Sequence, residues 1–156
     1  VPDGLTRVFF SENGAAAVDE TLVAFTGASQ AYIDREVQHQ TIEILRRSGM
    51  FRMVQPKIPL SGRRVIVTDD GVATGSTMLS SLMAIHREKP SELVCALPVG
   101  PEDTIRRLAD FCDLMICLRC PPWFAAVGQF YEDFEQASDD DVLEVLRRFH
   151  NAKARP

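Results

Sequence analysis

Three short apolar runs in the second half of the sequence constrain its fold more than any other feature. They are VIVT at Val65–Thr68, LVCALPV at Leu93–Val99 and LMICL at Leu114–Leu118. Runs that are apolar at successive positions are typical of strands buried on both faces of a sheet. Segments with helical spacing of apolar residues separate them, from Ser76 to about Glu88 and from Pro101 to Phe111. This alternation predicts a doubly wound parallel α/β sheet with crossover helices.

The first half of the sequence is predicted to form two strands and one long helix. The runs Thr6–Phe10 and Thr21–Phe25 are β-branched and aromatic, and the turn-forming pair Asn13-Gly14 lies between them. We therefore expect two strands, joined as a hairpin with a long loop. From Ser29 or Gln30 to Arg47 the apolar residues recur at helical spacing, and Ser48-Gly49 is expected to end this helix.

The acidic run Asp139–Asp141, which follows Ser138, predicts the start of a last helix. Hydroxyl and carboxylate side chains at this position accept hydrogen bonds from the free N–H groups of a first helical turn. Apolar residues continue at helical spacing to Phe149. Capping is the favoured interpretation of the three acids, and a metal role is the less expected one.

Composition narrows the class of protein. With 156 residues, of which 46% are hydrophobic, the chain 1–156 is expected to bury one core as a single domain. Lys and Arg number 17 against 22 for Asp and Glu, a net charge of -5, which disfavours a general nucleic-acid binder. No apolar run approaches the roughly 20 residues of a membrane helix, so the cytoplasm is the expected compartment. The chain begins with Val1, which suggests a processed product or a piece of a longer protein.

The segment Gly71–Thr77 (GVATGST) has the features of a phosphate-binding loop. It joins a predicted strand to the amino end of a predicted helix, where free N–H groups and the helix dipole favour an anion. Small residues allow the backbone to wrap a phosphate, and hydroxyl side chains add donors. A Walker A loop requires Lys and a dinucleotide loop requires G-x-G-x-x-G, and neither occurs here. The candidate phosphate ligands are Ala73, Thr74, Gly75, Ser76 and Thr77.

Two adjacent acids, Asp69 and Asp70, lie between the first apolar run and this loop. They are expected at the carboxyl end of a parallel strand, where ligands bind in open α/β sheets. A phosphate would repel them, so we expect them to contact sugar hydroxyls, directly or through a bound magnesium ion. Sugar and phosphate on one ligand indicate a phosphorylated ribose. The alternative is a capped turn with a solvated acid pair.

The stretch VIVTDDGVATGSTM resembles the signature of the type I phosphoribosyltransferases, with strand, acid pair, loop and helix in the same order. The resemblance implies that Asp69 and Asp70 contact the ribose of phosphoribosyl pyrophosphate (PRPP) and that Ala73–Thr77 hold its 5-phosphate. It also implies transfer of phosphoribosyl to a nitrogen base in nucleotide salvage, with magnesium on the pyrophosphate. Ala73 matches adenine-type loops, since the hypoxanthine and guanine enzymes carry an acid there, so a 6-oxopurine is the less expected substrate.

The stretch PPWFAAVGQFYEDF, Pro121–Phe134, follows the third apolar run. It is similar to the segment in which purine phosphoribosyltransferases stack the base, and Trp123 and Phe124 are the candidate base-binding residues. Ordinary packing of these rings is an equally weighted alternative. No role is assigned to Tyr131.

A helix motif ahead of the signature, Ala31–Glu36 with Gln40, is similar to one in orphan bacterial phosphoribosyltransferase-like proteins. In that group a further strand, helix and strand come before the position of Val1, so the domain is expected to be incomplete at its N-terminus. An exposed sheet edge would invite association, with a homodimer as one expected outcome.

The sequence leaves two functions open. One is a phosphoribosyltransferase; the other is a non-catalytic module that binds PRPP or a nucleoside monophosphate for regulation. The second is favoured by the absence of a recognisable pyrophosphate-binding turn in the sequence before the signature. The cations available there are Arg7, Arg35, Arg46, Arg47, Arg52 and Lys57.

The four cysteines allow a further interpretation. Cys112, Cys117 and Cys120 reproduce part of a ferredoxin spacing, with Cys95 as a fourth thiol. Cys95 and Cys117 lie inside apolar runs, however, where small buried thiols are common. Packing is therefore the favoured role, and no residue is assigned with certainty as a metal ligand.

Overall fold

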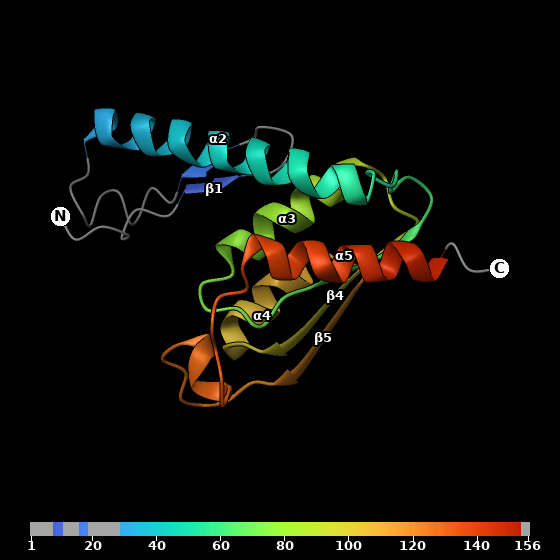
Figure 1. The fold of residues 1–156 in the computed structure, drawn as a ribbon. Coiled ribbons are helices and arrows are strands. Elements are labelled where there is room, and N and C mark those ends of the chain that lie inside the picture. Colours follow the sequence, from blue (N-terminus) through green and yellow to red (C-terminus); the bar gives the residue numbers. More distant parts are fainter. Residues whose placement is uncertain (1–7, 11–15, 19–28, 154–156) are drawn as a thin grey trace. The chain divides into compact units, whose positions relative to one another are not determined.

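The computed structural model describes residues 8–10, 16–18 and 29–153 (Figure 1). The chain groups into two compact units. We call residues 59–134 the sheet unit, and residues 1–58 with 135–156 the helical unit. The prediction of a single domain stays a prediction.

The sheet unit consists of a three-stranded parallel sheet with crossover helices. Its strands lie in the order β3-β4-β5, so β4 is central. Val65 lies opposite Leu93, and Val94 lies opposite Leu114. Its elements are β3 (Arg64–Thr68), α3 (Ser76–Arg87), β4 (Glu92–Val99), α4 (Glu102–Ala109), β5 (Leu114–Arg119) and the 3-10 helix η1 (Val127–Phe130). These bounds confirm the predicted alternation and the α/β class of the fold.

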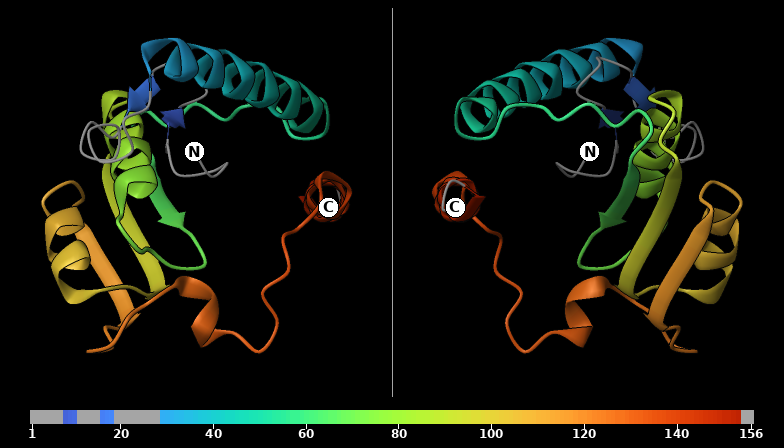
Figure 2. Two further views of the ribbon diagram at one scale, coloured as in Figure 1. Left: turned by 90° about the vertical axis from the view of Figure 1, so that its left-hand side faces the viewer. Right: turned by 90° about the vertical axis from the view of Figure 1, so that its right-hand side faces the viewer.

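One face of this sheet carries the core of the unit. Both helices lie on the same side of the sheet (Figure 2), as two crossovers of the same hand in one direction require. Leu82 of α3 and Leu108 of α4 are fully buried against Cys95. The core is Val72, Met78, Leu82, Leu93, Cys95, Leu97 and Leu108.

The other face of the sheet is apolar but has no helix of the sheet unit on it. On that face of β4, Val94 is buried, with 6% of its surface exposed, and Ala96 and Pro98 are half-buried. The outer strands differ, because Ile66 of β3 is 64% exposed and Leu118 of β5 is 76% exposed. The core-facing side of all three strands is buried or half-buried as predicted, whereas no part of the sheet unit itself covers the other side of β3 and β5, which lie at the two edges of the sheet.

Where the structure describes the helical unit, it shows two short strands and two helices. β1 (Val8–Phe10) pairs antiparallel with β2 (Ala16–Val18), and Val8 lies opposite Val18. The strand predicted at Thr21–Phe25 falls outside the described residues, and β2 was not predicted. The helices are α2 (Gln30–Val54) and α5 (Asp139–Lys153). Among the helices within the described ranges, none is long and apolar enough to cross a bilayer.

Helix α2 continues through the predicted stop at Ser48-Gly49, so that prediction was wrong. A glycine inside a helix costs only about 1 kcal/mol, and the residues after it (MFRM) form helices readily. The helix ends at Val54 instead. Gln55 is extended, with φ -127° and ψ 97°, because Pro56 follows it and disfavours the helical conformation.

Helix α5 begins with the predicted cap. The Asp141 amide donates to Ser138 Oγ at 3.2 Å, and the Ser138 amide donates to Asp141 Oδ2 at 2.8 Å. Asp139 in the first turn accepts from Arg46 of α2 at 2.5 Å. Arg46 and Arg47 also pair with Glu43, at 2.6 and 2.9 Å. These ion pairs join α2 to α5 within the helical unit.

The hydrogen bond from Arg46 lowers the pKa of Glu43 to about 2, which makes the ion pairs sensitive to acid. A carboxyl group with a lowered pKa stabilises the fold above its unfolded pKa of about 4.5, and this contribution is lost as the pH falls toward about 2. We expect Glu43→Gln to lower the melting temperature at about pH 6, with a difference from wild type that shrinks below pH 4.5. Thermal melts at several pH values test this, with Glu144→Gln, which breaks an ion pair inside α5 alone, as control.

Candidate functional site

The carboxyl ends of the three parallel strands meet at one edge of the sheet unit. The loop after β3 is fastened to the end of β4, since the Val72 amide donates to the Val99 carbonyl at 3.0 Å. The Gly100 amide donates in turn to the Arg119 carbonyl at the end of β5, at 3.2 Å. The acid pair, the predicted phosphate loop and the start of the aromatic segment are therefore brought to the same edge, which is where ligands bind in open parallel sheets.

Gly71 allows this close approach. It is buried, and a Cβ added to it would lie 2.8 Å from Val99 Cγ1 and 2.9 Å from the Val99 carbonyl oxygen. One of these neighbours is backbone and cannot turn away. The turn after Asp70 therefore requires a residue without a side chain.

Asp69 and Asp70 lie directly after β3 and are both exposed, as the sequence predicts. Asp69 Oδ1 accepts from the Asp70 amide at 3.0 Å, which fixes its carboxylate beside the main chain. Partial desolvation of its carboxyl group by neighbouring atoms raises the pKa of Asp70, although the residue as a whole is exposed, and the negative charge of Asp69 raises it further. Both effects disfavour the ionised form of Asp70, so hydroxyl donors or a cation at this position would be bound favourably.

The predicted phosphate loop leads into α3 through a left-handed glycine. Gly75 has φ +73° and precedes the first helical residue, Ser76. Thr74 Oγ1 and Ser76 Oγ lie 3.3 Å apart, so two hydroxyl groups stand side by side at the amino end of the helix. Free N–H groups, these hydroxyls and the positive end of the α3 dipole make the loop a suitable anion site.

Helix α4 contacts this loop from the side of the core. Thr104 Oγ1 donates to the Ala73 carbonyl at 3.0 Å, and Arg107 donates to the Thr74 carbonyl. Thr104 is 8% exposed and is the buried polar residue of the described structure. No sequence pattern indicates either contact, because they join residues 31 and 33 positions apart.

The aromatic rings of the segment Pro121–Phe134 lie in different environments, some exposed and some packed on one another. Trp123 is 86% exposed, and no described aromatic ring packs on it. Phe124 packs on Phe130, with ring centroids 5.4 Å apart. The structure shows no contact between these two candidate base-binding residues and the acid pair, and their role stays a prediction.

Tyr131 is the aromatic residue that reaches the acid pair. Its hydroxyl donates to the main-chain carbonyl of Asp70 at 2.5 Å, and its ring lies 5.3 Å from that of Phe134. This contact fixes the aromatic segment to the loop after β3. No local sequence pattern indicates this role of Tyr131, because the bond joins residues 61 positions apart.

The cysteines do not form part of this site. Burial raises the pKa of Cys95 to about 11 and also raises the pKa values of Cys112 and Cys117, so these groups stay protonated at neutral pH. Metals bind the thiolate form, so the raised pKa values disfavour a cluster. No group of three or more His, Cys, Asp or Glu side chains among the described residues is arranged to hold a metal ion.

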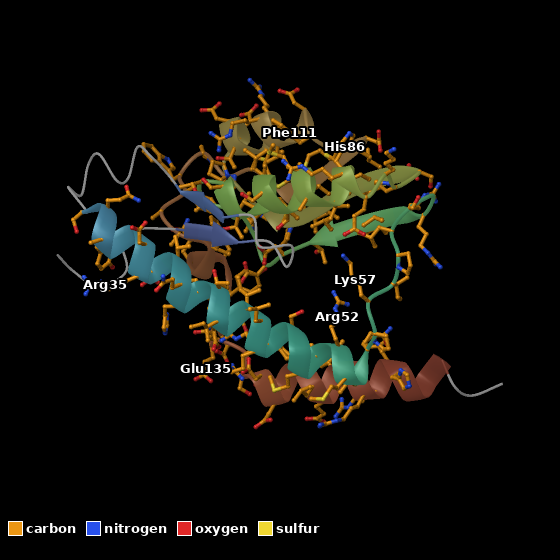
Figure 3. All side chains as sticks on the ribbon, turned by 90° about the horizontal axis from the view of Figure 1, so that it is seen from above. Arg35, Arg52, Lys57, His86, Phe111 and Glu135 are labelled. Atoms are coloured by element: carbon orange, nitrogen blue, oxygen red, sulfur yellow. The ribbon has the colours of Figure 1, made fainter. Side chains whose placement is uncertain are left out.

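A separate hollow of about 210 Å³ lies at the opposite edge of the sheet unit. It is formed by the end of α3, the start of β4 and the connection from α4 to β5. His86 and Phe111, labelled in Figure 3, are among its lining residues. It lies away from the acid pair and is smaller than the roughly 300 Å³ at which ligand pockets begin, so it is no alternative nucleotide site.

Two left-handed glycines of the sheet unit allow a test of the loop packing. A Cβ on Gly75 would lie 2.7 Å from Thr104 Cγ2, whereas a Cβ on Gly62, with a similar φ of +70°, would meet nothing within 4 Å. We expect Gly62→Ala to cost about 1 kcal/mol for the backbone alone. Gly75→Ala should cost about 1–3 kcal/mol more, because α4 or the loop must move. Urea unfolding of both variants measures the difference, and equal losses would contradict the packing described here.

Comparison with known proteins agrees with this geometry. The model of the phosphoribosyl transferase domain matches residues 10–135. Two Mycobacterium tuberculosis proteins, from strains CDC 1551 and H37Rv and provisionally named phosphoribosyl transferases, are each 37% identical over 139 residues, which is 89% of this chain. The chain spans only 31% of their length.

A solved structure has the same fold. The crystal structure of TT1426 from Thermus thermophilus matches with a TM-score of 0.70 and 34% identity, over 93% of this chain and 67% of that one. The family model covers most of the chain, including the acid pair, the loop and the aromatic segment. The chain therefore belongs to the phosphoribosyl transferase domain family.

Proposed function

We propose that the carboxyl edge of the sheet unit binds PRPP and that the protein transfers its phosphoribosyl group to a nitrogen base, with a purine as the favoured class. One observation carries the proposal. Within a single unit, two carboxylates come directly before a loop with free amides, two adjacent hydroxyls and a helix amino end. A sugar and a phosphate monoester on the same ligand match these two neighbouring groups.

The acid pair is proposed to bind the ribose. Carboxylates accept strong hydrogen bonds from hydroxyl groups, and the 2- and 3-hydroxyls of ribose are adjacent donors. Asp70, whose carboxyl group is partly desolvated beside a like charge, would gain most from such donors. The residues Ala73–Thr77 would then hold the 5-phosphate through amides and hydroxyls.

The residues present fit a magnesium ion that arrives with the pyrophosphate of the donor. Two neighbouring exposed carboxylates supply hard oxygen ligands, which Mg²⁺ prefers, and Mg²⁺ commonly keeps waters and phosphates as its other ligands. Asp69 and Asp70 would contact the ion directly or through the ribose hydroxyls. The ion supplies charge neutralisation of the leaving pyrophosphate.

Positioning is the main contribution proposed for the chain itself. Transfer of a ribosyl group passes through a state with positive charge on the sugar, which nearby carboxylates stabilise. Holding the 5-phosphate and the two hydroxyls at once fixes the sugar for attack by the base. Trp123, whose ring is exposed, is the candidate platform on which the base stacks.

A non-catalytic ribose-phosphate-binding module is the second candidate. A transferase needs cations to bind the pyrophosphate of its donor. Two of the arginines that come before the signature, Arg46 and Arg47, are already held in ion pairs by Glu43 and Asp139, which favours the module. Calorimetry with PRPP and magnesium, followed by incubation of labelled PRPP with a panel of bases, separates the candidates. Binding with transfer supports the enzyme, binding without transfer supports the module, and no binding contradicts both.

Removing the acid pair should weaken ligand binding without weakening the fold. We expect Asp69→Asn with Asp70→Asn to lower the affinity for PRPP about tenfold or more, since charge-assisted hydrogen bonds are lost. The melting temperature should stay constant or rise, because the substitution relieves the repulsion that raises the pKa of Asp70. Asp110→Asn, which removes a carboxylate at the opposite edge, is the matched control. A large drop in melting temperature would mean that the acids are structural.

The raised pKa of Asp70 also predicts a pH dependence of binding. An acid with a raised pKa takes up a proton at a higher pH than an ordinary Asp, and the protonated form loses its attraction for hydroxyl donors. Affinity for ribose 5-phosphate should fall as the pH falls through this raised pKa. Asp70→Asn should remove that part of the dependence, which titration at several pH values would show. An unchanged profile in the variant would assign the dependence to the ligand.

A further inference from the structure

The two contacts from α4 to the phosphate loop fix the direction of two peptide groups. The carbonyls of Ala73 and Thr74 both point toward α4, where Thr104 and Arg107 bind them. The described residues contain no cis peptide bond, so in each of these groups the N–H points opposite to the C=O. The N–H groups of the same peptides, which belong to Thr74 and Gly75, therefore point away from α4.

These two amides have no hydrogen-bond acceptor within the described part of the chain. Across the described ranges, neither the Thr74 amide nor the Gly75 amide donates a hydrogen bond to a protein acceptor. Gly75 is nevertheless a buried residue. Successive unpaired amides at a helix amino end form a concave site for an anion.

Arg107 brings a positive charge behind the same loop. The segment from Asp69 to Thr77 contains no Lys or Arg, so the loop itself has no cation to balance a phosphate. In the described structure no carboxylate pairs with Arg107, whereas its neighbour Arg106 is paired with Glu102. A guanidinium group bound to a carbonyl polarises the peptide, which makes the N–H on its other side a stronger donor.

We infer that Thr104 and Arg107 are positioning residues for a phosphate monoester: they turn the Thr74 and Gly75 amides toward the ligand, and Arg107 adds positive charge behind them. This inference rests on the proposed function, because it assigns the 5-phosphate to the same loop. Neither residue touches the reacting atoms. Their contribution is to hold the loop in its binding conformation before the ligand arrives, which removes an ordering cost from binding.

Titration of the full chain with ribose 5-phosphate tests the role of Arg107. We expect Arg107→Gln to weaken binding about tenfold, the effect of losing one charge-assisted interaction. Arg107→Lys should recover part of this loss, because the charge is retained. Arg106→Gln, one position away on the same helix, should leave the affinity within about twofold of wild type, since it breaks only an exposed pair with Glu102.

Amide NMR supplies a readout that a merely structural role would not change. On addition of ribose 5-phosphate to the wild-type chain, the Thr74 and Gly75 amide signals should shift, and in Arg107→Gln the shifts should be reduced at equal saturation. Thr104 offers an independent pair of variants. Thr104→Val removes the donor to the Ala73 carbonyl and should weaken binding, and Thr104→Ser keeps the hydroxyl and should restore it.

The outcomes separate this inference from the proposed function. If the wild-type chain binds ribose 5-phosphate and Arg107→Gln binds it equally well with unchanged amide shifts, the inference is overturned and the proposed function stands. If the wild-type chain binds neither ribose 5-phosphate nor PRPP, both are overturned. Should Arg107→Gln fail to fold by circular dichroism, Arg107→Lys and the Thr104 pair decide the question in the same assays.

Discussion

The candidate site depends on one main-chain contact, the hydrogen bond from the Val72 amide to the Val99 carbonyl. It ties the loop after β3 to the end of the central strand. The contact is possible only because residue 71 is a glycine, since a side chain there would collide with Val99. From this point the chain has only a few residues before α3 begins at Ser76. The direction of the loop and the position of the helix amino end are therefore both set by the parallel pairing of β3 with β4.

A second consequence of this arrangement is that α4 serves two purposes. Its apolar side, with Leu108, fills the core of the sheet unit. The same helix presents Thr104 and Arg107 to the carbonyls of the loop. Because the crossover from β4 to β5 lies on the same face as α3, the helix is placed beside the loop by the topology alone.

The local features of the site could be predicted from sequence, because each depends on neighbouring residues. The position of Asp69 and Asp70 after an apolar run marks the end of a strand, and a small-residue turn before an apolar helix marks an anion site. Helix α5 was predicted for the same reason, since Ser138 and Asp141 cap it within one turn. Features that depend on distant residues could not be predicted. The hydroxyl of Tyr131 meets the carbonyl of Asp70 only after β5 has joined the sheet, and no pattern near Tyr131 indicates this.

The length of α2 was missed because local propensity treats Gly49 as a stop, whereas one glycine inside a 25-residue helix costs only about 1 kcal/mol and the residues after it continue the helix to Val54. The roles of Trp123 and Phe124 stay predictions, since the position of a base relative to these rings depends on contacts between distant parts of the chain.

The face of the three-stranded sheet that α3 and α4 do not cover (Figure 2) has a practical consequence for a shortened chain. Apolar side chains lie on the side of the sheet away from α3 and α4, namely those of Ile66, Ile116 and Leu118. Patches of this kind on a protein that stands alone promote self-association and precipitation. A fragment trimmed to Pro59–Phe134, although it holds every residue proposed to bind the sugar and its phosphate, would need polar replacements on these strands to remain in solution.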